Sequence, residues 1–393
     1  MTQETKSSLL MKKDVTIETF VFLIVLLGSC IFLGTRMGIS NFASTLLATA
    51  FDLLINTCFY IMAITVMMGA IAALFTEFGI TALINKLLSP LMKPLFGLPG
   101  CFSLSSVVCF LSDCPAVIPF VNDPGFARYI KQYHAAASIC LGSTFGMNLI
   151  VSTFFLGKGP EFIPAVIIGN LACIVGGIIA VRIMLYFGKK EYGNDTSALE
   201  YLEGTDHEVV FTPGQRKIRE GSVLDRVLSC IIDGGMSGVD SGLKIIPGVL
   251  VICTIVMLLT FGPSTVDGVE VYTGGAYEGV ALLPRLGDLL SVILTPLFGF
   301  SSSECVSLPF ISLGAVGSAM SVAGRLFDQG LASVHDVCTF IGLGCVFTGF
   351  LGGIASMMEA VHCRELTMKA CLAHVIGGVA AGVIANYAYL LIL

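Results

Sequence analysis

The chain has 393 residues, of which 55% are hydrophobic and only 12% are charged. A soluble globular domain carries charge on about a quarter of its residues, so a chain this apolar could not cover a water-facing surface of the required size. This composition excludes most cytosolic enzymes, secreted disulfide scaffolds and disordered chains. It indicates an all-α polytopic membrane protein in contact with the lipid bilayer. The net charge is −6, and the absence of a basic patch gives no reason to expect binding to nucleic acid.

Residues 1–42 are predicted to form an N-terminal tail and a first transmembrane helix. Lys6, Lys12 and Lys13 precede an apolar run over residues 20–33. This pattern resembles a signal peptide, but no Ala-x-Ala cleavage site follows it. We therefore favour an uncleaved helix whose lysine-rich side faces the cytoplasm.

The apolar runs that follow predict two sets of about five membrane segments. The first set occupies residues 43–187 and the second occupies residues 228–393. The expected segments of the first set are residues 51–74, 81–96, 101–121, 133–156 and 162–187. Those of the second set are residues 244–262, 281–298, 301–322, 334–352 and 368–392.

A charged segment, residues 188–227, separates the two sets. Fourteen of the 48 charged residues of the chain lie within residues 188–226, and six of these fourteen are basic. The segment lacks an apolar periodicity long enough to form a core, so we interpret it as a linker and not as a domain. Its basic residues favour a cytoplasmic location.

Two blocks of sequence indicate that the halves arose by duplication. Residues 87–97 (LLSPLMKPLFG) match residues 289–299 (LLSVILTPLFG) at a shift of 202, and residues 171–177 (LACIVGG) match residues 372–378 (LAHVIGG) at a shift of 201. With the N-terminal tail and the linker both inside, an odd number of crossings per half makes the halves inverted repeats, as in many secondary transporters. This parity holds if residues 81–96 cross the membrane, and it changes if they are re-entrant.

The strongest candidate for a functional residue is Asp113. It lies in an apolar run beside Ser112, and Pro115 interrupts the helix there. Acids at membrane depth are costly and often functional, and broken helices expose backbone groups that bind ions and polar solutes. The alternative is that Asp113 caps a helix near the interface.

A similar stretch in the second half contains Ser302, Ser303 and Glu304. Glu304 is the candidate for contact with the solute or the ion, with the serine hydroxyls beside it. The pattern Ser301-x-x-Glu304 is also that of a helix capping box, and the sequence does not decide between these two roles.

Two further polar residues interrupt apolar runs. Asn148 is either a contact for substrate or a hydrogen-bonding residue between helices. Glu359 either lines a cavity or faces a cytoplasmic loop. The fourteen cysteines form no Cys-x-x-Cys pair and most lie in apolar runs, so neither a metal site nor a disulfide framework is expected.

The Leu-Leu-Ser…Pro-Leu-Phe-Gly block, the Leu98-Pro99-Gly100 element after it and the acid-x-Pro element Asp113-Cys114-Pro115 resemble the nucleoside-recognition (gate) domain family. That domain is shared by concentrative nucleoside transporters, ferrous-iron transporters and spore-maturation membrane proteins. The chain resembles two such domains fused. The resemblance implies inverted repeats, helical hairpins that meet at a central site, and solute transport coupled to Na⁺ or H⁺.

One element of the nucleoside transporters is only partly present. Their Gln-Thr-Glu-Ala-Pro element contacts substrate, and here Asp113 and Pro115 match its acid and its proline. Ser112 stands at the threonine position and Leu111 at the glutamine position. A nucleoside is therefore one of several small polar solutes to consider.

The function that we predict is secondary active transport of a small polar organic solute, such as a nucleoside-like compound, an amino acid or a small peptide. We expect coupling to Na⁺ or H⁺, no other cofactor, and a location in a bacterial inner membrane. The alternative is a non-transporting membrane scaffold or regulator of the spore-maturation type. The motifs GxxxxGK[ST], HExxH and GxSxG are absent from the sequence, so no enzyme activity is predicted. Self-association into a homo-oligomer is left open.

Overall fold

The computed structural model describes residues 14–202, 218–266, 269–314, 316–347 and 353–393. Within these residues, several helical segments are long and apolar enough to cross a membrane. They are Ile17–Met37, Ile39–Glu77, Gln132–Lys158, Pro160–Tyr192 and Arg364–Ile392. The chain is therefore a multi-pass α-helical membrane protein, and the class predicted from the composition is confirmed.

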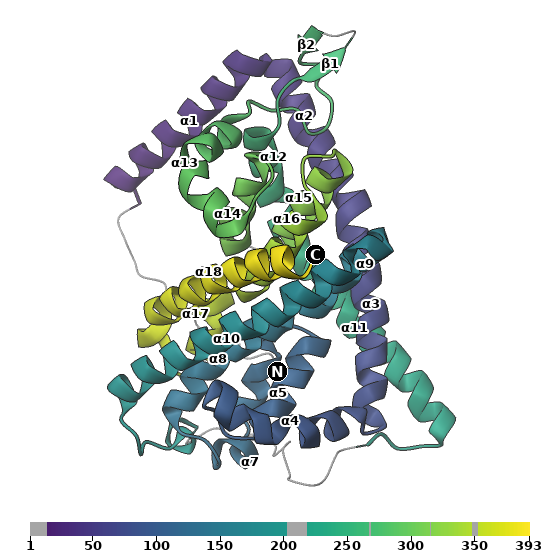
Figure 1. Ribbon diagram of the computed structural model, residues 1–393, viewed down its shortest axis with the longest axis vertical. Helices are drawn as coiled ribbons and strands as arrows, with labels where there is room; N and C mark the ends of the chain where they lie inside the picture. The colour runs from purple at the N-terminus through teal and green to yellow at the C-terminus, as the bar shows by residue number, and fades with distance from the viewer. Residues whose placement is uncertain (1–13, 203–217, 267–268, 315, 348–352) are drawn as a thin grey trace.

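The first half consists of long helices, one amphipathic helix and a helical hairpin (Figure 1). Its elements are α1 (Ile17–Met37), α2 (Ile39–Asp52), the π-helix η1 (Leu53–Cys58), α3 (Phe59–Glu77), α4 (Ile80–Phe96), α5 (Phe102–Leu111), the 3₁₀ helix η2 (Cys114–Val117), α6 (Ile118–Val121), α7 (Pro124–Ala127), α8 (Gln132–Gly146), α9 (Asn148–Lys158), η3 (Pro160–Phe162), α10 (Ile163–Tyr192) and η4 (Ala198–Tyr201).

The second half contains a similar series of helices with a short antiparallel β-hairpin inserted. Its elements are α11 (Val223–Gly248), the π-helix η5 (Val249–Cys253), α12 (Thr254–Thr260), β1 (Ser264–Val266), β2 (Val269–Val271), α13 (Leu282–Phe298), η6 (Glu304–Val306), α14 (Ser307–Gly314), α15 (Val316–Asp328), α16 (Val334–Phe347), α17 (Gly353–Ala360), η7 (Arg364–Leu366) and α18 (Thr367–Ile392).

The sequence placed the starts of two helical segments too late. The helix expected at 51–74 begins at Ile39, and the helix expected at 244–262 begins at Val223, within the charged segment. Charged residues in the early turns of α11 do not end the helix, because they have partners. Arg226, for example, donates from Nε to the Glu77 carboxylate at 2.7 Å.

The helices α4 and α13 have matching ends. Each spans seventeen residues and ends at a glycine with positive φ, 76° at Gly97 and 67° at Gly299. A glycine in this left-handed conformation is the common helix C-terminus. The amide of Gly97 donates to the Met92 and Lys93 carbonyls, and that of Gly299 donates to the Thr295 carbonyl.

The carbonyls left free at these two helix ends receive donors from the last long helix of each half. In the first half, Arg182 of α10 donates to the carbonyls of Pro94 and Leu95. In the second half, Asn386 and Tyr387 of α18 donate to the carbonyls of Leu297 and Pro296. Different side chains thus make the same kind of contact at positions 202 residues apart.

The helices α10 and α18 run side by side near the centre of the fold (Figure 1). A Cβ on Gly176 would overlap the Gly377 carbonyl, and a Cβ on Gly377 would contact the Gly176 carbonyl in the same way. These two glycines correspond to each other in the sequence match, so equivalent residues of the two halves contact each other. The contact supports the duplication.

The amphipathic helices lie at opposite ends of the molecule. In Figure 1, α4 runs along the lower end, whereas α13 lies in the upper part of the molecule, beneath α1. The crossing of the membrane by residues 81–96, on which the predicted parity depends, stays a prediction. Placement at opposite ends supports the inverted repeats, which stay a prediction.

At the upper end, Glu278 holds together the loop around the β-hairpin. Its side chain is 2% exposed and accepts hydrogen bonds from the Ser264 hydroxyl at 2.7 Å, the Thr273 amide at 2.9 Å and the Gly274 amide at 3.0 Å. Burial alone opposes its ionisation, but these hydrogen bonds outweigh it and lower the pKa of Glu278 below the ordinary value of 4.5.

This pKa shift predicts acid sensitivity of the loop. The stabilisation by ionised Glu278 is present above pH 4.5 and is lost as the pH falls through the lower pKa of the folded state. At pH 7 we expect Glu278→Gln to weaken the protection of the Thr273 and Gly274 amides in hydrogen exchange by about 1–3 kcal/mol. The difference from wild type should shrink below pH 4.5. A difference that stays constant from pH 7 to pH 3 would contradict this role.

Candidate functional site

The wall of the candidate site is formed by α3 and α11, which pack through small residues. Gly234 and Gly238 lie one turn apart on α11, and each would place a Cβ against the backbone of α3. The Thr65 hydroxyl of α3 donates to the Gly238 carbonyl at 2.7 Å in a buried position. Small residues allow helix backbones to approach closely in membranes, so the two helices form one rigid wall.

Opposite this wall, α5 ends at Leu111 and the chain turns sharply. Ser112 donates from its hydroxyl to the Val108 carbonyl at 2.7 Å, and the Asp113 carboxylate accepts from the Cys114 amide at 2.7 Å. Asp113 is the N-cap of η2, with Pro115 in the first turn. The capping alternative for Asp113 is therefore seen in the structure, and the side chain is half-buried.

The turn after α5 lies directly on α8. A Cβ on Gly142 would approach the Cys114 carbonyl, and a Cβ on Gly146 would overlap the Cys114 backbone. Immediately afterwards Met147, with φ −120° and ψ −3°, separates α8 from α9. The break after α5 and the break between α8 and α9 therefore lie close together. Glycines at positions 142 and 146 allow this close approach.

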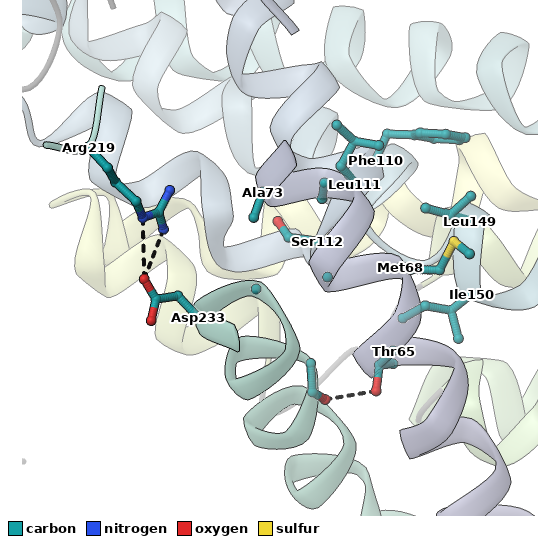
Figure 2. A pocket seen from close by; sticks show the side chains of 14 residues that line it. Thr65, Met68, Ala73, Phe110, Leu111, Ser112, Leu149, Ile150, Arg219 and Asp233 are labelled. Carbon is teal, nitrogen blue, oxygen red and sulfur yellow. Dashed lines mark hydrogen bonds and ion pairs between the residues drawn. The ribbon is translucent and has the colours of Figure 1, made fainter. Parts of the chain in front are cut away.

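These elements line a partly open cavity of about 260 Å³ (Figure 2). It lies between the α3–α11 wall, the end of α5 and the first turn of α9. Its polar groups include Ser112, Thr65, Arg219 and Asp233, and the rest of the lining is apolar or glycine. The end of α5 and the beginning of α9 face this space, where helix termini carry partial charges of opposite sign.

A cluster of charges lies beside the cavity. Arg219 pairs with Asp233 at 3.1 Å and with Glu77 at 3.2 Å, and Arg226 pairs with Glu77 at 2.7 Å. Glu77 is 4% exposed, whereas Asp233 is 62% exposed. The cluster therefore runs from the buried end of α3 to the surface, and Arg219 and Asp233 mark the polar end of the cavity.

The candidates of the second half, Ser302, Ser303 and Glu304, do not occupy the position that Asp113 has in the first half, at the turn after α5. Glu304 begins η6, and η6 and α14 together extend about 15 Å before the chain reaches Gly314. At the shift of 202, Glu304 corresponds to Phe102 at the start of α5, whereas Asp113 corresponds to residue 315, outside the described residues. Asp113 and Glu304 thus occupy non-equivalent places in their halves.

The capping box that was one of the two alternatives for Ser301 and Glu304 is not seen in the structure. Both the amide and the hydroxyl of Ser301 donate to the buried carboxylate of Asp336. Ser302 accepts weakly from the Cys305 amide at 3.4 Å, and Ser303 lies 3.5 Å from the Glu304 carboxylate. Ser301 bonds to Asp336 and not to Glu304. An acid at position 336 is favoured because it lies at the N-terminus of α16.

Neither Asn148 nor Glu359 is among the residues that line the cavity. Asn148 is 1% exposed and donates to the Asn170 side chain of α10 at 2.8 Å, which matches the helix–helix alternative. Glu359 is 63% exposed and lies 3.7 Å from Arg364, which matches the surface alternative. Of the residues singled out in the sequence, Ser112 lines the cavity and Asp113 adjoins it.

Sequence reasoning missed Thr65, Arg219 and Asp233. Thr65 lies in an apolar run in which a single hydroxyl carries little signal, and the two charges lie in or near the segment interpreted as a linker. The spacing Gly234-x-x-x-Gly238-x-x-x-Gly242 was the signal that could have identified the wall.

No protein-family model and no curated protein matches the chain. Solved structures do match. The transporter CNTnw in an inward-facing substrate-bound state has a TM-score of 0.54 at 15% identity, covering 95% of this chain and 84% of that chain. A doubly substituted form in an outward-facing state has a TM-score of 0.54 at 15% identity, covering 94% and 83%.

A form of CNTnw in an intermediate state has a TM-score of 0.51 at 14% identity, covering 94% of this chain and 84% of that chain. At this identity the likeness is one of fold. The chain thus has the fold of the concentrative nucleoside transporter structures over most of its length.

Proposed function

We propose that the protein is a secondary active transporter of a small polar organic solute, coupled to Na⁺ or H⁺, in a bacterial inner membrane. The observation that carries the proposal is the 260 Å³ cavity between the α3–α11 wall and the interrupted elements α5–η2 and α8–α9. Its polar groups and helix ends suit a solute that is polar and compact. Irregular backbone at membrane depth occurs where it lines such a space.

The size of the cavity limits the solute. Sites for drug-sized ligands begin at about 300 Å³, so the space matches an amino acid or a single nucleoside-like ring system better than a peptide. The Thr65 and Ser112 hydroxyls both donate to backbone carbonyls, so their free lone pairs are acceptors. We infer a solute with N–H or O–H donors.

The comparisons support a conformational cycle without identifying the solute. Structures of CNTnw in inward-facing and outward-facing states match the chain with the same TM-score. A fold solved in both states suits alternating access, in which one part of the molecule moves against another around a central site.

Uptake into proteoliposomes tests the function. Purified protein is reconstituted and challenged with radiolabelled nucleosides, amino acids and dipeptides under an inward Na⁺ gradient, an inward H⁺ gradient or neither. We expect one solute class to accumulate under one gradient only. No accumulation of any solute, together with a stable partner protein that co-purifies, would instead favour the scaffold alternative.

The Asp113 carboxylate is expected to bind the coupling ion or the solute. Asparagine caps a helix about as well as aspartate, so Asp113→Asn removes the charge and keeps the hydrogen bond to the Cys114 amide. We expect at least a tenfold loss of uptake, equivalent to about 1.4 kcal/mol, with an unchanged melting temperature.

Matched variants show where the effect resides. Glu359→Gln removes an exposed acid and should leave uptake unchanged. Glu304→Gln tests the separate group formed by Ser302, Ser303 and Glu304. Full uptake by the Asp113→Asn, Glu304→Gln double variant would exclude both acids from the mechanism.

A further inference from the structure

A second cavity, of about 430 Å³, lies under α4 and is not used by the proposed solute site. One face of α4 lines it, with Ile84, Leu88, Leu91, Met92, Leu95 and Phe96 at helical spacing. The remaining lining comes from α3, α5, α8 and α10. Ser106 is the one hydroxyl residue there, and its oxygen donates to the Phe102 carbonyl of its own helix.

The cavity opens at the outer surface of the protein. Leu88, Leu91 and Leu95 are 36–47% exposed, whereas Met92 and Phe96 are 4% exposed. The stripe on α4 thus leads from the surface to a buried interior. An apolar space of this kind does not hold water, and if it were empty its lining would lose dispersion contacts.

The charge on α4 indicates what lies outside the helix. The helix carries Lys86 and Lys93 and no Asp or Glu. The two lysines are seven positions apart and so share one face of the helix, and their offset from the lining residues places that face opposite the apolar stripe. Both are exposed, and neither has an ion pair or side-chain hydrogen bond among the residues described by the structure. Arg182 adds a third cation at the C-terminal end of α4.

We propose that the cavity holds an acyl chain of an anionic phospholipid, whose headgroup meets the cations of α4. An amphipathic helix of this kind lies at the membrane interface with its lysines at headgroup depth, and anionic lipid of the cytoplasmic leaflet attracts such cations. The lower end of the molecule, along which α4 runs in Figure 1, is also the end at which α10 (Ile163–Tyr192) finishes and α11 (Val223–Gly248) begins.

The bound acyl chain would contact residues of α5 that also line the solute cavity. Phe110 and Leu111 line both cavities, and the α5 turn with Ser112 follows them directly. The acyl chain therefore supports the end of α5 from the side opposite the solute.

A single introduced tryptophan tests the proposal, because the sequence contains none. Phe96→Trp places an indole in the buried part of the cavity, and Ile84→Trp is a second probe in the same stripe. Phe22→Trp, at a position 69% exposed on α1, reports bulk lipid, and Phe155→Trp reports the protein core. Each variant must keep the elution volume and melting temperature of wild type.

The measurement is quenching by phospholipids brominated on the acyl chain. In vesicles of brominated phosphatidylglycerol, we expect Phe96→Trp to be quenched at least half as much as Phe22→Trp, and Phe155→Trp less than a tenth as much. With one tenth brominated phosphatidylglycerol in plain phosphatidylcholine, Phe96→Trp should be quenched about three times more than Phe22→Trp. Adding Lys86→Gln and Lys93→Gln should abolish this excess.

Two outcomes overturn the proposal. Quenching of both cavity probes as weak as that of Phe155→Trp shows that no acyl chain enters. Equal quenching by brominated phosphatidylcholine and phosphatidylglycerol shows that the site does not select anionic lipid. Since neither measurement involves solute uptake, the result is independent of the transport proposal.

Discussion

Replacing Gly238 by alanine is expected to lower the free energy of unfolding by about 2 kcal/mol or more. A Cβ at this position would overlap the Thr65 carbonyl and contact the Val66 backbone. Because the obstacle is backbone and not the end of a flexible side chain, α3 and α11 must move apart. Their separation also weakens the hydrogen bond from the Thr65 hydroxyl to the Gly238 carbonyl.

Gly235 provides the matched control on the same helix. A Cβ there would lie 3.6 Å from the nearest atom, Val66 Cγ1, which is an ordinary contact. Gly235→Ala should therefore be neutral or stabilising, since alanine favours a helix by about 1 kcal/mol over glycine. The melting temperatures of both variants in detergent, with elution profiles, test this difference. Equal stability of the two variants would show that α3 and α11 are not tightly packed at Gly238.

Asp336→Asn is expected to destabilise the protein by about 2–3 kcal/mol. The Asp336 side chain is fully buried and its carboxylate accepts from the amide and hydroxyl of both Ser301 and Ser333. An asparagine of the same size presents an NH₂ group to donors that need an acceptor, and at least one of them is left unsatisfied. The loss should separate the start of α16 from the chain that leads into η6.

The control for this prediction is Asp328→Asn, at the end of α15. Asp328 is 54% exposed and pairs with Lys158 at 2.7 Å. Exposed pairs contribute up to about 1 kcal/mol, so this variant should differ little from wild type in thermal unfolding. If Asp336→Asn unfolds at the wild-type temperature, its carboxylate does not hold the two serines as described.

The repeat made the amphipathic helices predictable to within one residue. The shared Pro-Leu-Phe-Gly ending fixes where α4 and α13 stop, because proline and glycine constrain the backbone there. The sequence alone could not predict the environment of a charged side chain whose partners lie far away in the chain. Arg325, for example, pairs with Asp52 at 2.8 Å and lies over the Tyr277 ring, and these contacts join residues far apart in the sequence.

The candidate site was predicted only in part, because some of its features are local in the sequence and others depend on neighbouring helices. A break in a helix is visible in local sequence, as at Ser112, Asp113 and Pro115. The direction of a polar side chain depends on what packs beside it, so the contact of Asn148 with Asn170 could not be derived from either residue alone. The position of Glu304 was misaligned with Asp113 because both precede apolar runs with proline.

The hydrogen bond between Thr65 and Gly238 has a mechanical consequence. Both residues belong to the lining of the solute cavity and to the interlock of α3 with α11. This side of the cavity is therefore held together by direct contact between the backbones of the two helices. In the proposed transport cycle we therefore expect the cavity to change size by displacement of the α5 turn and α9 relative to α3 and α11.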